Sequence, residues 1–250
     1  MKIFALFKKT IVKLTNVNLL IEPNIRFLVT YIRAIYFLKI KRSLKTLESE
    51  DAIGKTVIHN LKSILPSNNR IGLLLYPLSV IESLNKDSKI LIIGPRNEND
   101  LFFLRGLGFH KKNIVGLDLI SYVENIKIGD MHSIPFESNS FDCVVCGWTL
   151  SYSEYPQKAA TEILRVVKNN GLIAIGVEYS LMTKEDDIKA LGYVLQGNSS
   201  RINSTHQILN LFINNVKEVY FSHDAPNKKS HSALMVKDVS NVASIFSINK

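Results

Sequence analysis

From residue 89 onward, short apolar runs alternate with segments of helical periodicity. Continuous apolar runs of this kind are typical of strands that are buried on both faces of a parallel sheet. The predicted strands are 89–93, 113–118, 125–130, 141–148 and 171–178. The predicted helices are 98–107, 155–168 and 204–212. This alternation predicts an α/β fold with a Rossmann-like, doubly wound and mostly parallel sheet.

The C-terminal part of the chain contains two more runs with strand character. They cover residues 216–221 and 232–236 and are joined by a polar loop. Strands joined in this way are expected to pair as an antiparallel hairpin. The hairpin would add one antiparallel strand to the sheet.

Residues 1–85 precede these strands and have a different pattern. Between residues 26 and 45 the pattern is helical, because apolar residues recur at steps of three and four while polar residues gather on another face. The apolar residues are Leu28, Tyr31, Ile32, Ile35 and Leu38, and the polar ones are Arg26, Thr30 and Arg33. The sequence therefore predicts a basic amphipathic helical extension over 1–85 and a second domain over 86–250.

The positive charge of the chain lies in this extension. The formal net charge is +9, and residues 1–45 hold ten Lys and Arg against one acid, whereas residues 46–250 hold 21 basic and 21 acidic residues. Three interpretations follow. The segment 1–45 lies on an anionic membrane surface; it binds nucleic acid; or it forms a helical cap or a homodimer contact with a solvated basic face. Nucleic-acid binding is not expected, because no known module is recognisable and the aromatic residues fit burial better.

The two cysteines and the apolar runs bear on location. Cys143 and Cys146 have C-x-x-C spacing but lie in a predicted strand, so their side chains point to opposite faces and are expected to be buried thiols. No charge-free apolar run reaches the roughly 18 residues of a spanning helix. Lys8 and Lys9 interrupt the first apolar run too early for a signal peptide. We expect a cytoplasmic protein, peripheral at the inner membrane surface if the first interpretation of the extension holds.

Three of the predicted strands end in residues suited to a ligand site. Gly94 follows the first strand, while Asp118 and Asp130 are the last residues of the second and third, and ligands in such sheets bind beyond the carboxyl ends of the strands. Glycine lets the backbone turn sharply, and one carboxylate can accept hydrogen bonds from both hydroxyls of a ribose while the other accepts from an amine such as that of adenine. Each residue alone also fits a turn or a helix cap. Together they predict an adenosine-shaped cleft.

Two longer motifs carry a family resemblance. Residues 129–142 read GDMHSIPFESNSFD, and residues 162–171 read EILRVVKNNG. Both resemble motifs of class I S-adenosylmethionine-dependent methyltransferases, in particular the small-molecule type called type 11. The resemblance covers residues 89–178 well and extends to the hairpin, but not to residues 1–85. It implies methyl transfer from S-adenosyl-L-methionine to a small-molecule or glycan-like acceptor.

The resemblance also implies where the cofactor would bind. The implied cofactor-binding residues are Gly94, Pro95, Glu98, Asp118, Leu119, Asp130, Met131 and Trp148. Trp148 and Tyr152 would line the mouth of the cleft. A hydroxyl acceptor would need a base, for which His132 is the candidate beside His223 and His231, and no metal site is expected.

The glycine loop departs from the family pattern, which reads approximately D-x-G-x-G-x-G. Here Gly94 is kept, while Ile92, Arg96 and Glu98 replace the acid and the later glycines. Either the loop has another shape, with Glu98 contacting the ammonium group of the cofactor, or the chain is a non-catalytic, methyltransferase-like scaffold or binding protein that has lost cofactor binding. The family also usually has a helix where residues 119–124 can hold at most a turn, which would remove one wall of the cleft.

Overall fold

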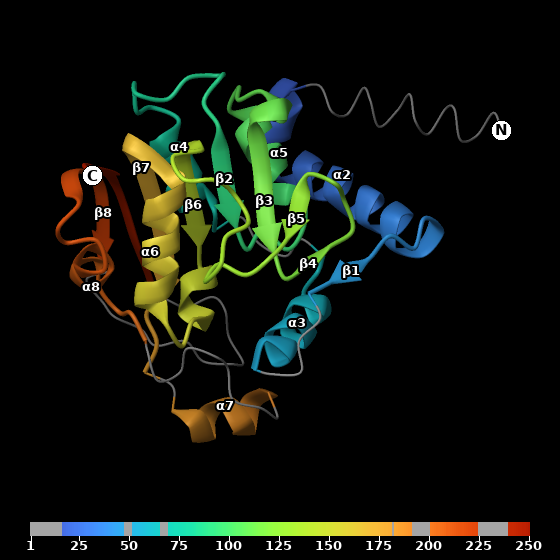
Figure 1. Cartoon of the computed structure of the whole chain (residues 1–250). Helices are drawn as coiled ribbons and strands as arrows, with labels where there is room; N and C mark the ends of the chain where they lie inside the picture. Colours follow the sequence, from blue (N-terminus) through green and yellow to red (C-terminus); the bar gives the residue numbers. More distant parts are fainter. Residues whose placement is uncertain (1–16, 48–51, 66–69, 182, 192–200, 225–239) are drawn as a thin grey trace.

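The computed structural model describes most of the chain. The described residues are 17–47, 52–65, 70–181, 183–191, 201–224 and 240–250. The central element is a seven-stranded sheet with the order β5-β3-β2-β6-β7-β9-β8. Its strands are β2 (Ile90–Ile93), β3 (Ile114–Asp118), β5 (Ile126–Ile128), β6 (Phe141–Gly147), β7 (Val167–Glu178), β8 (Val216–Asp224) and β9 (Asn241–Ile248). All pairs from β5 to β7 are parallel, and β9 is antiparallel to both of its neighbours (Figure 1).

The two faces of the sheet are covered by different helices. On one face, α6 (Pro156–Val166) and α8 (Thr205–Asn210) contribute to the apolar core. On the other, α4 (Gly72–Leu78) and α5 (Asn99–Gly106) do so. Alternate residues of β2 enter the two cores, which explains why this strand is apolar throughout. The prediction of a doubly wound α/β fold is confirmed.

The predicted pair of cysteines behaves as expected. Cys146 lies in the core beside α6, whereas Cys143 lies in the core beside α4 and α5. Both are free and buried, and burial raises their thiol pKa values well above the ordinary range. They are inert core residues.

The predicted helices and strands agree with the structure to within a few residues, with one exception between α6 and β7. The helix predicted over 155–168 ends at Val166, because β7 begins at Val167 and not at residue 171. After α5, Gly108 has a φ of +101°, a conformation that glycine adopts readily at the end of a helix.

The C-terminal pair of strands is confirmed as a topology but not in its residues. β8 pairs with β9, which covers 241–248, whereas the predicted strand 232–236 lies outside the described residues. β9 lies between β7 and β8 and is buried along its length. Five of the seven residues 242–248 are apolar, and the two others, Ser244 and Ser247, are buried with them.

The N-terminal extension is helical, as predicted, and is joined to the sheet. Its elements are a 3-10 helix η1 (Val17–Ile21), α2 (Pro23–Ile35), a π-helix η2 (Tyr36–Ile40), β1 (Lys45–Thr46), α3 (Ala52–Lys62) and α4. β1 pairs with β4 (Ile120–Ser121), a short strand that follows β3. Ile71, Leu74, Leu75 and Leu78, in and beside α4, belong to the core of the sheet. The remaining short elements are η3 (Lys111–Asn113), η4 (Thr149–Tyr152) and α7 (Lys184–Leu191).

The predicted faces of α2 are reversed. Arg26 and Thr30 are buried, and Arg33 forms an ion pair with buried Glu98. The apolar residues Leu28 and Tyr31 are instead exposed. The interpretation of a solvated basic face is therefore wrong for these two arginines, because they find hydrogen-bond acceptors against η1 and α5.

No helix in the described part of the chain has both the length and the apolar character needed to cross a membrane. The cytoplasmic location stays a prediction.

Candidate functional site

A cavity of about 520 Å³ lies at the carboxyl ends of the central strands. This edge of the sheet is the lower one in Figure 1, on the side of α3. Small-molecule sites commonly have volumes of about 300–1,000 Å³. Seven of the eight residues predicted for the cofactor line the cavity: Gly94, Pro95, Asp118, Leu119, Asp130, Met131 and Trp148. His132 and Tyr152 line it as well.

The turn after β2 has an unusual backbone. Gly94 has a φ of +75° and donates its N–H to the carbonyl of Leu117 at 2.8 Å. A Cβ at this position would overlap the side chain of Thr149, whose hydroxyl donates to the carbonyl of Ile93 at 3.1 Å. Gly94 is thus required by the close approach of η4. Arg96 also has a positive φ, +53°.

Asp118 is buried at the end of β3. Its carboxylate accepts hydrogen bonds from the backbone N–H of Arg96 at 2.8 Å, from the backbone N–H of Ile120 at 3.2 Å, and from the side-chain amide of Asn60 at 3.2 Å. Burial raises the pKa of Asp118, while the backbone donors act in the opposite direction. These bonds hold the carboxylate in one orientation at the cavity wall.

Asp130 is less buried and is supported by His132. Its Oδ1 accepts from the backbone N–H of His132 at 3.0 Å and from the ring Nδ1 at 2.7 Å. Burial would raise the pKa of Asp130, but the hydrogen bonds from His132 outweigh it and the pKa is lowered. The carboxylate is therefore ionised at neutral pH. Its Oδ2 makes no hydrogen bond with the described residues.

Both ring nitrogens of His132 are engaged. Nε2 lies 2.6 Å from the hydroxyl of Ser153, and that hydroxyl oxygen accepts the backbone N–H of Tyr155 at 3.1 Å. The ionised carboxylate of Asp130 can only accept, so Nδ1 is the donor to it, and in the neutral ring Nε2 accepts the hydroxyl proton of Ser153. Of the other histidines, His223 lies on β8 and does not line the cavity, and His231 lies outside the described residues.

Glu98 does not lie in the cavity, contrary to prediction. It is buried away from the cavity and forms an ion pair with Arg33 of α2, with oxygen–nitrogen distances of 2.7 and 3.0 Å. A helix turns by about 100° per residue, so residues two apart point in different directions. Asp100, in the first turn of α5, lines the cavity instead. Burial raises the pKa of Asp100 to about 6, although Asn99 and nearby arginines act against the rise.

The extension supplies one side of the cavity, which the sequence did not predict. The lining residues from the extension are Thr56, Asn60, Ser63, Leu65, Arg70 and Ile71. Thr56, Asn60 and Ser63 follow one another at steps of four and three, so they share the helical face that meets Asp118. This side replaces the wall that the short 119–124 segment would have removed. The polar periodicity of α3 is the signal that could have identified it.

Two arginines lie along the cavity. Arg96 donates from Nη1 to the hydroxyl of Ser63 at 3.0 Å, and its guanidinium is 5.9 Å from the ring centre of Tyr152. Arg70 forms an ion pair with Glu178 and lies 4.9 Å from the ring centre of Trp148. Burial lowers the pKa of Arg70 to about 10. The cavity has its volume of about 520 Å³ with both arginine side chains in its wall, so neither of them fills it.

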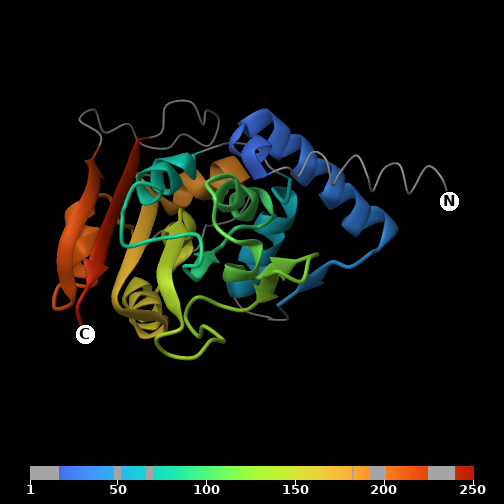
Figure 2. The ribbon, with the colours of Figure 1, turned by 90° about the horizontal axis from the view of Figure 1, so that it is seen from above.

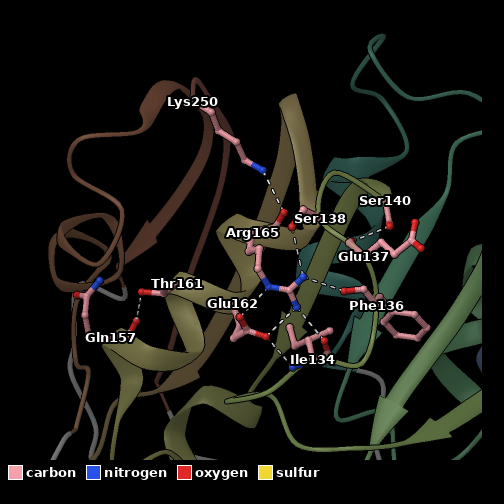
Figure 3. Close-up of polar contacts among 10 residues, drawn as sticks. All are labelled: Ile134, Phe136, Glu137, Ser138, Ser140, Gln157, Thr161, Glu162, Arg165 and Lys250. Carbon is pink, nitrogen blue, oxygen red and sulfur yellow. Dashed lines mark hydrogen bonds and ion pairs between the residues drawn. The ribbon is translucent and has the colours of Figure 1, made fainter.

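The two longer sequence motifs contact one another (Figure 3). Arg165 of α6 donates to the carbonyls of Ile134 and Phe136, each at 2.8 Å, and to the carboxylate of Glu162 at 2.8 Å. Glu162 in turn accepts the backbone N–H of Ile134 at 2.7 Å. The pKa of Glu162 is lowered by Arg165. The helix thereby fixes the loop that carries Asp130.

The fold is a mostly parallel, Rossmann-like sheet with one antiparallel strand, β9, inserted between β7 and β8, and with its cavity at the carboxyl edge. Residues 103–175 match a family model described as a methyltransferase domain, of type 11. The resemblance predicted from the sequence is confirmed. The matched segment includes both motifs but not the glycine loop.

One solved structure supports the fold, and two others are similar over most of their length. A complex from Haloferax volcanii holds the Trm112 methyltransferase activator and a protein assigned as a methyltransferase; that match has 14% identity, covers 70% of this chain and 88% of that chain, and has a TM-score of 0.50. S-adenosylmethionine-dependent methyltransferases from Methanosarcina mazei and Mesorhizobium loti each match at 13% identity. They cover 67% and 66% of this chain and 96% and 94% of theirs, with TM-scores of 0.48 and 0.47. No curated protein matches the sequence.

Proposed function

We propose that this chain binds S-adenosyl-L-methionine and transfers its methyl group to a small-molecule or glycan-like acceptor. The observation that carries the proposal concerns Asp118, at the end of β3, and Asp130, just after the neighbouring strand β5. Both line one cavity beside the turn at Gly94. The matched methyltransferase domain and the fold support methyl transfer as the reaction.

The polar groups of the cavity fit the chemistry of the cofactor. In this proposal the fixed carboxylate of Asp118 accepts from the ribose hydroxyls, and the free Oδ2 of Asp130 accepts from the adenine amine. Asp100 takes the role first given to Glu98 and holds the ammonium group. Arg96 holds the carboxylate of the methionine end. Leu119, Met131 and Trp148 provide apolar surface for the base.

When bound, the cofactor supplies a methyl group on a positively charged sulfur. The residues of the chain contribute mainly by orienting the acceptor and by excluding water. Tyr152 and Tyr155, which line the cavity together with Trp148, are the proposed acceptor-side surface. His132 is a positioning residue that orients Asp130, because its two ring nitrogens are already hydrogen-bonded, one to Asp130 and the other to Ser153.

Equilibrium binding tests the proposal directly. We expect the folded wild-type protein to bind S-adenosyl-L-methionine in isothermal titration calorimetry. Asp130→Asn and Asp118→Asn should each weaken binding by about tenfold or more, because each removes a charge-assisted acceptor. Asp87→Asn, which changes a carboxylate outside the cavity lining, should bind like wild type.

A folded wild-type protein that does not bind at sub-millimolar cofactor would overturn the proposal. It would favour the non-catalytic scaffold instead. Far-UV circular dichroism on the same samples confirms that each variant is folded.

A further inference from the structure

Helix α2 turns its polar side toward the protein. The guanidinium of Arg26 is fully buried, donates to the carbonyls of Leu20 at 2.9 Å and Ile21 at 3.0 Å, and lies 4.0 Å from the ring centre of Phe103. Its Nε donates to the side chain of Asn99 at 3.1 Å. Thus the residues that would normally face water are used for attachment to α5.

The outward side of α2 and its flanking elements is apolar. Leu28, Tyr31 and Ile35 follow one another at steps of three and four and are 50%, 46% and 40% exposed. We call the exposed apolar residues of this segment the apolar band: Leu19, Ile21, Leu28, Tyr31, Ile35, Ile40 and Leu44. The exposed face of a surface helix is usually polar, so the exposed apolar stripe of Leu28, Tyr31 and Ile35 is a candidate contact surface.

Positive charge adjoins the apolar band. Lys39, Lys41, Arg42 and Lys45 are exposed near its C-terminal end, and we call them the basic cluster. Within residues 17–47 the one acid is Glu22, and no member of the cluster forms an ion pair with a described carboxylate. Both views show α2 at the opposite end of the molecule from β8 and β9 (Figures 1 and 2).

We propose that the apolar band and the basic cluster together bind the surface of an anionic phospholipid bilayer. Apolar side chains of a helix that lies flat in the interface reach the boundary between headgroups and acyl chains, while neighbouring cations contact lipid phosphates. Nucleic acid would neutralise the cluster but leave the apolar band in water. A second copy of the chain would cover the band but bring a second set of cations toward the first. An anionic bilayer satisfies both features at once.

Co-sedimentation of the full chain with vesicles tests the proposal. We expect binding to vesicles of phosphatidylglycerol and phosphatidylcholine, and much weaker binding to pure phosphatidylcholine. The triple variant Leu28→Gln, Tyr31→Gln, Ile35→Gln should lose most of the binding, because it removes the apolar contact without adding charge. The variant Lys39→Gln, Lys41→Gln, Arg42→Gln should bind about a hundredfold more weakly, since each cation near an anionic surface contributes roughly fivefold.

A matched control distinguishes binding through this face from nonspecific hydrophobic binding to the vesicles. Val80→Gln and Ile213→Gln change side chains that are 78% and 67% exposed and lie outside this segment, so the double variant should bind like wild type. Added salt should weaken wild-type binding, because it screens the cluster. Circular dichroism verifies that all variants are folded.

Three outcomes would overturn the proposal. The first is unchanged vesicle binding by both triple variants, which would place the contact elsewhere in the chain. The second is a dimer in sedimentation velocity that the apolar triple variant abolishes, with no vesicle binding. The third is tight binding of a DNA duplex that depends on the basic cluster and not on the band. Vesicle binding is measured without cofactor, so its result is independent of the proposed methyl transfer.

Discussion

Two carboxylates at the start of α5 show how the direction of a side chain decides its role. Glu98 and Asp100 are separated by one residue, yet Glu98 pairs with Arg33 and Asp100 lines the cavity. The pKa of Asp100 is raised to about 6 because the group is buried, so its charge titrates just below neutral pH. A cationic group bound beside it would favour the ionised form.

Cofactor affinity should therefore depend on pH through Asp100. Above pH 6 the carboxylate is ionised and can hold the ammonium group, and below pH 6 it is protonated and the attraction is lost. We expect binding of S-adenosyl-L-methionine to weaken as the pH falls from 7.5 to 5.5. Asp100→Asn should bind more weakly at pH 7.5 and lose this pH dependence, as measured by calorimetry at several pH values. Glu98→Gln should keep it; a pH dependence that disappears in Glu98→Gln alone would return the role to Glu98.

The residue scale also shows what the sequence can and cannot predict. Asp118 and Asp130 were found from the sequence because a strand end is set by the local apolar pattern, and strand ends meet at one edge of the sheet. The direction of Glu98 was not found. It depends on how the chain turns after Gly94, where Arg96 adopts a positive φ, and nothing in the local pattern reports that turn.

At the scale of elements, the motifs that carry the family resemblance act as one unit. Helix α6 contributes Glu162 and Arg165, and the loop after β5 contributes the backbone groups of Ile134 and Phe136 (Figure 3). The guanidinium has donors in a planar fork, so it can reach two carbonyls and a carboxylate together. The loop carries Asp130 at its start, so the helix indirectly fixes the carboxylate in the cavity.

Removing this arginine should affect stability and binding together. Arg165→Ala leaves two carbonyls and the Glu162 carboxylate without their partner, which should lower the free energy of unfolding by about 1–3 kcal/mol. Urea denaturation measures that loss, and calorimetry should show weaker cofactor binding. Thr161→Ala on the same helix removes only a hydroxyl that donates to the carbonyl of Gln157, so it should change both quantities little. Equal effects of the two substitutions would contradict the assignment.

The side of the cavity next to residues 119–124 is built by a segment that lies far away in the sequence. Between Asp118 and Asp130 the chain is too short for a helix, and the sequence alone suggested an open side. In the structure β4 pairs with β1, and Asn60 of α3 bonds to Asp118 from 58 positions earlier in the chain. Periodicity within a segment predicts its own structure, but it does not predict which distant segment it will contact.

At the scale of the whole molecule, the extension and the sheet are joined by buried contacts. Arg33 of α2 pairs with Glu98, which is almost completely buried, and Arg26 bonds to Asn99 of α5. Leu74 and Leu75 of α4 lie in the core of the sheet. These contacts favour one cooperative unit over two domains divided near residue 85.

Unfolding should therefore occur in one transition. Trp148 is the single tryptophan of the chain and reports on the sheet, whereas far-UV ellipticity also reports on the helices of the extension. We expect the two denaturation curves of the wild type to overlay. Arg33→Ala should shift both curves equally. It should lower the free energy of unfolding by about 3–5 kcal/mol, because it leaves the Glu98 carboxylate buried without its partner. Adding Glu98→Gln to that variant should recover part of the loss, since the uncompensated charge is then gone. If ellipticity falls before the tryptophan signal, the extension unfolds on its own. The protein then consists of two domains divided near residue 85, and the buried ion pair does not make them one cooperative unit.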